Sequence, residues 1–462
     1  MGLSDLNGLT LNQEEREMEA TSKLAKFAHG LTFEALPAEV VFEAKLCLLD
    51  WLGVTLTGSK EPLGDILLDL AREEGGRPRA SVIGRPEKVP LLQAALINGA
   101  SSHALDFDDV HGGLMGHPSV VVLPGLLALG ENKGCSGRDL IAAFVAGFET
   151  ACHVGLCQTR SHPARGWHPT ATIGHFGAAA ACANLLRLDV DRTVHALGIA
   201  GTQAAGLRGV FGTMCKPFHA GKASANGLYA ALLAEKGFDS ARDIIEAEFG
   251  FTRTFTPDGN PSCTMEGLGE DYQILKVMFK RYASCFGTHP TIDAALAFRQ
   301  EGVAVDDVES VHVVPFHGLY DVIKIMKPRT GLEGKFSLPY TFAVAFVEGK
   351  AGEDCCTDSS VMGAEVSRLR DKVSMEIDET MPPNQSLVVL KTRDGRTMRK
   401  HVDVSQAMKN QEDKAEALQK KFYECAGVVL PSDLVEELYK KVMNIEEARD
   451  VKGIIGLCTV PA

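Results

Sequence analysis

The stretch HPTATIGHFGAAAACANLL, residues 168–186, decides the fold class of this chain. Gly and Ala dominate it, and a helix with such small side chains packs closely on its neighbours. Pro169 and Thr170 stand where a helix begins, since proline is favoured in the first turn and threonine at the cap. The stretch therefore predicts a central core helix.

Helical patterns extend outward from this stretch, from about residue 12 to residue 260. Glu39 to Val54 carries apolar residues at helical spacing. Ser136 and Asp139 have the spacing of a capping box ahead of the apolar run from Leu140 to Val145. Gly227 to Lys236 predicts a further helix, closed by Gly237.

The pattern changes after about residue 270. Val308 to Val314 alternates as a strand does, and Asp394-Gly395 separates two apolar segments as in a β-hairpin. Helical patterns recur over Pro339 to Glu348 and Glu412 to Glu447. A chain of 462 residues favours two domains. We predict a mainly α protein, with a large all-helical domain formed by both chain ends (1–269 and 405–462) and a smaller α+β lid domain (270–404).

The composition narrows the function. A net charge of −13 argues against broad nucleic-acid binding and means that an anionic substrate needs a local basic pocket. The N-terminal segment lacks the apolar core of a signal peptide. Leu140 to Leu156 contains Glu149 and His153, which favours a buried helix over a membrane span. The twelve cysteines include no C-x-x-C, so we expect core residues in a reducing cytoplasm and no metal.

One motif recurs three times: His117-Pro118-Ser119, His168-Pro169-Thr170 and His289-Pro290-Thr291 each precede an apolar run. The residue before proline is extended, so each histidine should lie just outside a helix N-terminus, an end that attracts anions. Lys216, His219 and Lys222 should similarly precede the helix around Gly227. Each copy alone also fits a plain helix start. Three copies in an acidic protein favour a functional role.

Charged clusters suggest the chemistry. Asp106-Phe107-Asp108-Asp109, followed by His111, is either a solvated acidic loop or a carboxylate group held by a positive partner. Lys280-Arg281 is either a solvated loop or a clamp for a carboxylate. The sequence has no Rossmann glycine motif, P-loop, HExxH or G-x-S-x-G motif. Proton transfer by His, Asp and Lys is the chemistry that remains.

Together these residues resemble the MmgE/PrpD family, which includes 2-methylcitrate dehydratase, cis-aconitate decarboxylase and iminodisuccinate epimerase. The resemblance runs over nearly the whole chain. Its landmarks are residues 44–52, Asn98-Gly99, the D-F-D-D run, residues 116–119, 166–170 and 216–221, and Phe279 to Tyr282.

The resemblance implies a homodimer with a site between a helical domain and an α+β lid. It also implies that Asp106, His117, His168, Lys216 and Lys280 form the site, with Tyr320 as a weaker match. Val110 stands where the mammalian-type decarboxylases have threonine, and the D-F-D-D to H-P spacing is one residue longer. These departures leave the substrate open.

We predict a cofactor-independent, metal-free lyase that dehydrates or decarboxylates a small di- or tricarboxylate such as cis-aconitate or 2-methylcitrate. The proton would move at a carbon alpha to a carboxylate, where negative charge develops. Two alternatives stay open: an epimerase acting on a dicarboxylate such as iminodisuccinate, and a non-catalytic carboxylate-binding dimer. The predicted catalytic residues are His117, His168, Asp106 and Lys216, and the predicted substrate-binding residues are Lys280, Arg281, His111, His219 and Tyr320.

Overall fold

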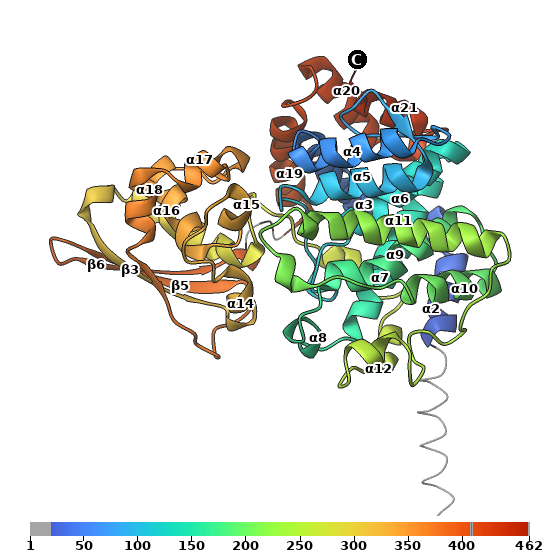
Figure 1. Cartoon of the computed structure of the whole chain (residues 1–462), viewed down its shortest axis with the longest axis horizontal. Helices are drawn as coiled ribbons and strands as arrows, with labels where there is room; N and C mark the ends of the chain where they lie inside the picture. Colours follow the sequence, from blue (N-terminus) through green and yellow to red (C-terminus); the bar gives the residue numbers. More distant parts are fainter. Residues whose placement is uncertain (1–19, 407, 409, 461–462) are drawn as a thin grey trace, which may run out of the picture.

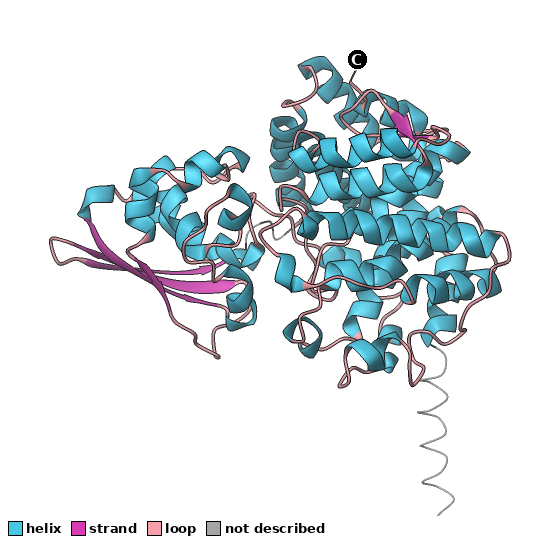
Figure 2. Cartoon of the chain, in the orientation of Figure 1, coloured by secondary structure: helices cyan, strands magenta, loops and turns pink. Residues whose placement is uncertain are grey.

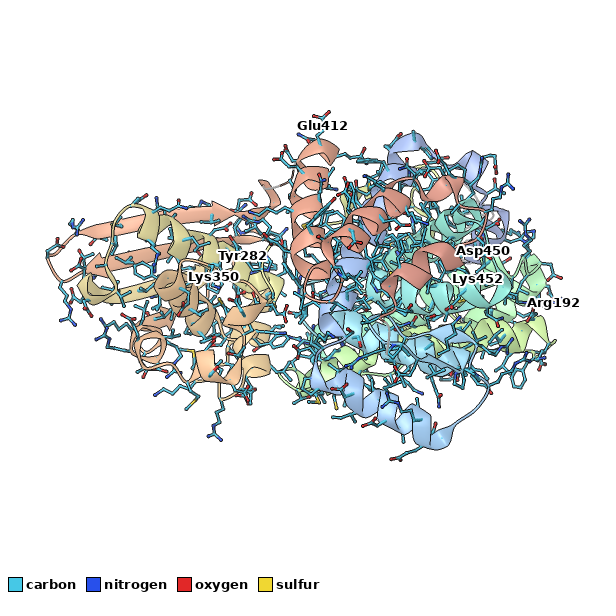
Figure 3. The ribbon with its side chains drawn as sticks, turned by 90° about the horizontal axis from the view of Figure 1, so that it is seen from above. Arg192, Tyr282, Lys350, Glu412, Asp450 and Lys452 are labelled. Atoms are coloured by element: carbon cyan, nitrogen blue, oxygen red, sulfur yellow. The ribbon has the colours of Figure 1, made fainter. Side chains whose placement is uncertain are left out.

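The computed structural model describes residues 20–406, 408 and 410–460. The predictions for residues 1–19, including the prediction that they form no signal peptide, lie outside the described residues. Two parts lie side by side in both Figure 1 and Figure 3. We call residues 20–281 and 410–460 the large part, and residues 282–406 the small part. The large part is helical, whereas the small part combines helices with a sheet (Figure 2), which confirms a mainly α fold with a smaller α+β portion.

The large part is built around α9 (Pro169–Leu185), the helix predicted from the Gly- and Ala-rich stretch. Two further helices, α7 (Gly137–Leu156) and α11 (Cys215–Glu235), pack along it. The close approach of α7 to α9 requires glycine, because a Cβ on Gly147 would lie 2.5 Å from the carbonyl oxygen of Gly177. Although α7 is long and apolar enough to cross a membrane, most of it is buried among these helices. The other long helices here are α2 (Ala20–Gly30), α3 (Ala38–Gly58), α4 (Pro62–Glu74), α5 (Leu91–His103), α6 (Ser119–Lys133), α10 (Val190–Gly201), α19 (Gln411–Ala426) and α20 (Ser432–Met443).

Both chain ends contribute to this core. Helix α19 packs on α3, and two lysines of α19 form buried ion pairs with α3. Lys414 lies 2.6 Å from Glu43, and Lys421 lies 2.6 Å from Asp50. The large part also holds a two-stranded sheet, β1 (Ala80–Ser81) with β2 (Lys88–Val89), which the helical pattern did not predict. Shorter helices in it are α8 (Ser161–Ala164), α12 (Phe251–Phe255) and α21 (Lys452–Ile455).

The small part has its own core, formed by one face of a four-stranded sheet and the helices beside it. The strand order is β4-β3-β5-β6, with β3 parallel to β4 and antiparallel to β5. The hairpin predicted at Asp394-Gly395 joins β5 to β6, and Gly395 has a φ of 91° that favours glycine there. The elements are α13 (His289–Gln300), β3 (Val308–Pro315), α14 (Tyr320–Ile323), α15 (Gly331–Gly334), α16 (Leu338–Glu348), α17 (Asp358–Val361), α18 (Ala364–Arg370), β4 (Val373–Met375), β5 (Gln385–Thr392) and β6 (Thr397–Asp403).

Helix α11 begins earlier than predicted. It starts at Cys215, so Lys216, His219 and Lys222 lie in its first turns and not in a loop before it. Proline at position 217 is compatible with this start because the first-turn N–H groups have no partner within the helix. The twelve cysteines are all free thiols, and most are buried as predicted, although Cys215 is exposed.

Candidate active site

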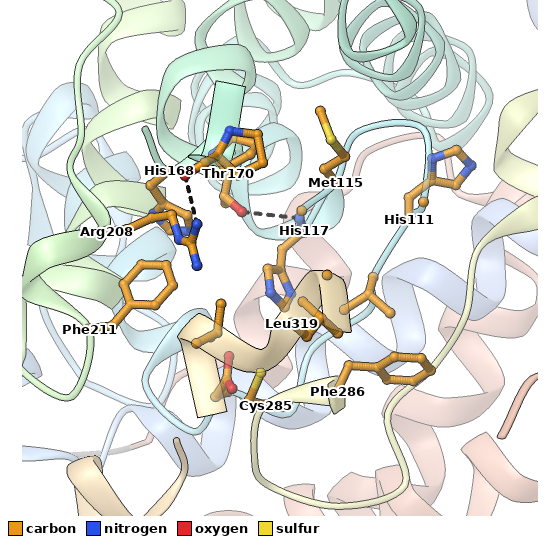
Figure 4. Close-up of a pocket in the computed structure, with 18 of the residues that line it drawn as sticks. His111, Met115, His117, His168, Thr170, Arg208, Phe211, Cys285, Phe286 and Leu319 are labelled. Carbon is orange, nitrogen blue, oxygen red and sulfur yellow. Dashed lines mark hydrogen bonds between the residues drawn. The ribbon is translucent and has the colours of Figure 1, made fainter. Parts of the chain in front are cut away.

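A cavity of about 240 Å³ lies between the two parts. Figure 4 shows His117 and His168 directed into it from the large part, facing Leu319 of the small part. The predicted residues Asp106, Lys216 and Lys280 line the same cavity. The charged groups among its lining residues all come from the large part. The small part supplies a mainly apolar wall, with Asn384 as a polar member beside Cys285, Phe286, Phe316, Leu319, Val322 and Phe336.

Two lysines share one carboxylate in the cavity wall. The Nζ atoms of Lys216 and Lys280 lie 2.6 Å and 3.0 Å from Oδ1 of Asp106, and all three side chains are at least 95% buried. Burial alone would raise the pKa of Asp106, but the two ammonium groups hold it well below its usual range. Burial lowers the pKa of Lys216, against the attraction of Asp106. The trio therefore keeps an excess positive charge beside the cavity.

A close helix crossing brings Lys216 to this place. A Cβ on Gly99 of α5 would lie 2.5 Å from the Cα of Gly221 in α11, so only glycine permits the approach. His103 ends α5 four residues after Gly99, and Lys216 stands in the first turn of α11 five residues before Gly221. Nζ of Lys216 lies 2.8 Å from Nε2 of His103. Because Gly99 and Gly221 let α5 and α11 approach closely, they also bring Lys216 into contact with His103.

Asp108 lies between two histidines. Its Oδ1 is 2.9 Å from Nδ1 of His103, and its Oδ2 is 2.8 Å from Nδ1 of His117. The same nitrogen of His117 is 2.8 Å from the carbonyl oxygen of Asp109. Because these neighbours can only accept hydrogen bonds, Nδ1 carries the proton in both rings. Nε2 of His117 is then an unprotonated nitrogen in the cavity wall, and Nε2 of His103 accepts a hydrogen bond from Lys216.

The two rings differ in how they titrate. Burial lowers the pKa of His103 to about 3, against the attraction of Asp108 and with the repulsion of Lys216. Burial also lowers the pKa of His117 from its ordinary value, and Asp108 opposes that shift. His103 stays neutral in the physiological range because its second nitrogen faces an ammonium group. His117 is the ring of the pair that is free to take up a proton.

The acidic run is buried, so the solvated-loop alternative is wrong. Asp106 pairs with lysines and Asp108 with histidines, whereas Asp109 accepts hydrogen bonds from the backbone N–H and the hydroxyl of Ser119, at the start of α6. Burial raises the pKa of Asp109 to about 8, although the bonds from Ser119 lower it. Three neighbouring carboxylates thus have three different environments.

His168 lies just outside α9 as predicted, and its Nδ1 is 3.0 Å from Nδ1 of His219. One ring must donate and the other accept, so at least one of them is neutral at that nitrogen. Burial lowers the pKa of both histidines, and Lys216 adds to each shift. His219 lies behind His168 and does not line the cavity.

The other predicted residues either have their polar atoms bonded to the protein or lie outside the cavity lining. His111 lines the cavity, but Nε2 bonds the carbonyl of Gln273 and Nδ1 accepts from the backbone of Gly113. Arg281 pairs with Asp293 and stacks on Tyr282 outside the cavity lining, so it is not placed as a clamp there. Tyr320, at the start of α14, also lies outside the lining. The prediction that His289 lies just outside its helix is wrong, because α13 begins at His289 itself with Thr288 at the cap. His289 is buried there, and its Nε2 has no hydrogen-bond partner.

Sequence reasoning missed three polar residues. His103 ends α5 without a motif, although its position five residues before Asp108 was a usable signal. Arg160 and Arg208 also line the cavity, and no local pattern marked either.

A metal site is conceivable in one place among the described residues, since the ligand atoms of His103, Asp108 and His117 lie within 4.8 Å of one another. The hydrogen bonds already account for this group, with both Nδ1–H groups directed to acceptors and an ammonium beside His103. A cation there would be repelled by Lys216. That the protein needs no metal ion stays a prediction.

Comparisons with known proteins identify a family for this chain. The MmgE/PrpD N-terminal domain matches residues 22–264, and the MmgE/PrpD C-terminal domain matches residues 282–446. Among curated relatives, the cis-aconitate decarboxylase-like protein oryM of Aspergillus oryzae is 27% identical over 97% of this chain and 99% of its own. The cis-aconitate decarboxylases of Homo sapiens and Aspergillus terreus are each 27% identical over 96% of this chain, covering 95% and 96% of their own lengths.

Proposed function

This chain belongs to the MmgE/PrpD family, and we propose that it is a lyase that removes water or carbon dioxide from a small di- or tricarboxylate. The enzyme class rests on the family and on relatives named as decarboxylases. One observation carries the chemistry. The unprotonated Nε2 of His117 lies in the same cavity wall as Lys216 and Lys280, the two lysines that share the carboxylate of Asp106.

Each group has a role in this proposal. A substrate carboxylate would lie near Lys216 and Lys280, whose excess positive charge stabilises the negative charge that develops on the adjacent carbon. In a dehydration, Nε2 of His117 removes the proton from that carbon, and Lys216 protonates the departing hydroxyl group. In a decarboxylation, carbon dioxide leaves, its bonding electron pair remains on carbon, and Lys216 supplies the proton that closes the reaction.

Asp108 and His103 are positioning residues in this scheme. Asp108 stabilises the imidazolium that forms when His117 takes up a proton, as a buried carboxylate does in a catalytic triad. His103 links Asp108 to Lys216 and holds the ammonium in place.

The two lyase reactions make different demands on His117, which gives a test. Purified enzyme would be incubated in D₂O with cis-aconitate, 2-methylcitrate, citrate and iminodisuccinate, and the products followed by NMR. Itaconate with one solvent deuterium means decarboxylation, and loss of water means dehydration. We expect Lys216→Met to abolish either reaction. His117→Gln should abolish dehydration but leave part of a decarboxylation, because that reaction needs no base.

Other outcomes separate the alternatives. Deuterium uptake without a change of skeleton would indicate the epimerase, with His117 and His168 as the two bases. Binding without any change, kept in His117→Gln, would indicate a carboxylate-binding protein. No binding and no change with any compound would contradict the substrate class. Activity lost with a chelator and restored by a divalent ion would contradict the metal-free prediction.

Assembly as a homodimer and a cytoplasmic location belong to the same proposal. The exposed side chains of Ile66 on α4 and of Met214, just before α11, line a small apolar cavity, and Leu70 on α4 is also exposed. Such a surface suits a subunit interface. Light scattering of the purified protein tests it, since a monomer at micromolar concentration would contradict the dimer.

A further inference from the structure

Among the residues that the structure describes, the cavity wall carries four cations, Arg160, Arg208, Lys216 and Lys280, and a single carboxylate, Asp106. Both lysines are bound to that carboxylate. In the described part of the chain, neither arginine forms a salt bridge with a carboxylate within 4.0 Å. Besides the one excess positive charge of the two lysines and Asp106, the positive charge in the cavity wall that lacks a counter-ion therefore belongs to the arginines, in a protein whose net charge is −13.

Arg208 is fixed in place. Its Nη1 donates a hydrogen bond of 2.6 Å to the carbonyl of Pro163, and its side chain is among the residues drawn around the pocket in Figure 4. Burial lowers the pKa of Arg208, with Asp321 of the small part opposing the shift from a distance. A guanidinium carries five N–H donors, and one of them is used here. The remaining donors suit an anion held in the cavity.

Arg160 lies against the small part. It precedes α8, and its guanidinium stands over the ring of Phe316 at 5.2 Å. A Cβ on Gly318 would lie 3.1 Å from Nη1 of Arg160, so glycine keeps this approach open. Phe316 and Gly318 line the same cavity. Arg160 is exposed and Arg208 half-buried, whereas the two lysines are buried, so the arginines mark the outer end of the cavity.

We infer that Arg160 and Arg208 form a second anion subsite, which binds the substrate carboxylate farthest from the reacting carbon. The inference rests on the proposed function, because the lysine pair is taken as the inner subsite. Two pairs of cations, the buried lysines and the more exposed arginines, match a substrate with at least two separated carboxylates. A guanidinium binds a carboxylate through two parallel hydrogen bonds, which a lysine cannot do. The site therefore selects polycarboxylates over monocarboxylates.

The test measures binding without turnover. Propane-1,2,3-tricarboxylate, a saturated tricarboxylate, would be titrated into wild-type protein by calorimetry, with butyrate as a monocarboxylate probe. We expect Arg208→Gln and Arg160→Gln each to weaken tricarboxylate binding about tenfold, and the double variant up to about a hundredfold, since charged hydrogen bonds are among the strongest. Arg208→Lys should recover part of the loss. Arg165→Gln is the matched control, because Arg165 follows α8 but does not line the cavity.

The outcomes keep this inference distinct from the proposed function. Unchanged tricarboxylate affinity in the double variant, or no binding by the wild-type protein, overturns the subsite. Equal weakening of butyrate and the tricarboxylate would show that the arginines only hold the small part in place, which also overturns it. If the tricarboxylate binds through the arginines but no compound reacts, the subsite stands and the lyase proposal fails. If turnover proceeds and its KM is unchanged in the double variant, the lyase proposal stands and the subsite fails.

Discussion

Two groups of buried lysines and carboxylates lie close together in the large part, and they differ in their charge balance. In the first, Lys414 pairs with Glu43 and Lys421 with Asp50, one cation to one anion. In the second, Lys216 and Lys280 share Asp106. We call the first the scaffold cluster and the second the site cluster. Lys421 joins them, since its Nζ also donates to the carbonyl oxygen of Lys280.

The difference shows how the same residue types serve structure and chemistry. The one-to-one ion pairs stabilise the contact between α3 and α19 and have no net charge that could bind a ligand. The unbalanced trio lines a cavity and keeps a positive charge that a carboxylate can neutralise. Burial is similar in both clusters, so burial alone does not identify a site. The ratio of cations to anions is what distinguishes the site cluster from the scaffold cluster.

Breaking the site cluster should give the largest effect on activity. Lys216→Met removes the proton donor, so we expect kcat to fall about 10³-fold or more. The thermal midpoint should stay within a few degrees, because Asp106 keeps Lys280 as its partner. Steady-state kinetics and calorimetry on the same preparation check both parts. A variant that unfolds at room temperature would show that the site cluster is structural.

Breaking the scaffold cluster should mainly reduce the stability of the fold. Lys421→Met leaves Asp50 buried without a partner, which should cost about 3–5 kcal/mol of unfolding free energy. Burial already raises the pKa of Asp50, and Lys421 opposes that shift. Without Lys421 the folded state should hold a proton that the unfolded state releases above about pH 4, so the deficit should grow as the pH rises.

Denaturant unfolding at several pH values measures this. Lys420→Met is the matched control, since the Lys420 side chain is exposed on the same helix. A loss of stability in Lys421→Met that does not depend on pH would contradict the pairing with Asp50.

The site cluster has histidines beside it, whereas the scaffold cluster is described by lysine–carboxylate pairs alone. The role proposed for His117 predicts a pH dependence of the activity. Since burial lowers the pKa of His117, the acid limb of kcat/KM for a dehydration should lie below pH 6.5. In Asp108→Asn the imidazolium loses its carboxylate, so the limb should move to still lower pH and the rate should fall about tenfold. Glu376→Gln, beside the exposed His312, should leave the profile unchanged. A limb that does not move would contradict the role of Asp108.

The smallest effect is expected outside the cavity. Arg281 forms a one-to-one pair with Asp293, like the pairs of the scaffold cluster but partly exposed. Arg281→Met should change KM and kcat less than about twofold and reduce stability by at most about 1 kcal/mol. Substrate titrations with this variant check the placement. A large rise in KM would restore the clamp predicted from the sequence.

The sequence predicted those features that depend on local pattern. His117 and His168 precede their helices as their H-P-[ST] motifs require, and the Asp394-Gly395 hairpin forms as expected. The start of α11 was placed too late because Lys, Pro, His and Gly interrupt its apolar pattern, whereas tertiary packing holds its first turns helical.

Partners distant in sequence could not be read from such patterns. The environments of Asp106 and Arg281 depend on which side chain lies nearest in the folded chain, and Asp106 meets a lysine 110 residues away. Arg160 and Arg208 gain their place only when the small part lies against the large one. Local spacing contains no such information.

The pairing of α19 with α3 also bears on biosynthesis. Lys414 and Glu43 are 371 residues apart, so at 5–20 residues per second the ribosome makes the cation about 20–70 s after the anion. During that time Glu43 and Asp50 cannot be buried as an ion pair, and the core of the large part cannot close. The core of the small part lies between residues 285 and 390 and is complete earlier. The later part of the sequence can therefore fold first, and the earlier part waits for the end of translation.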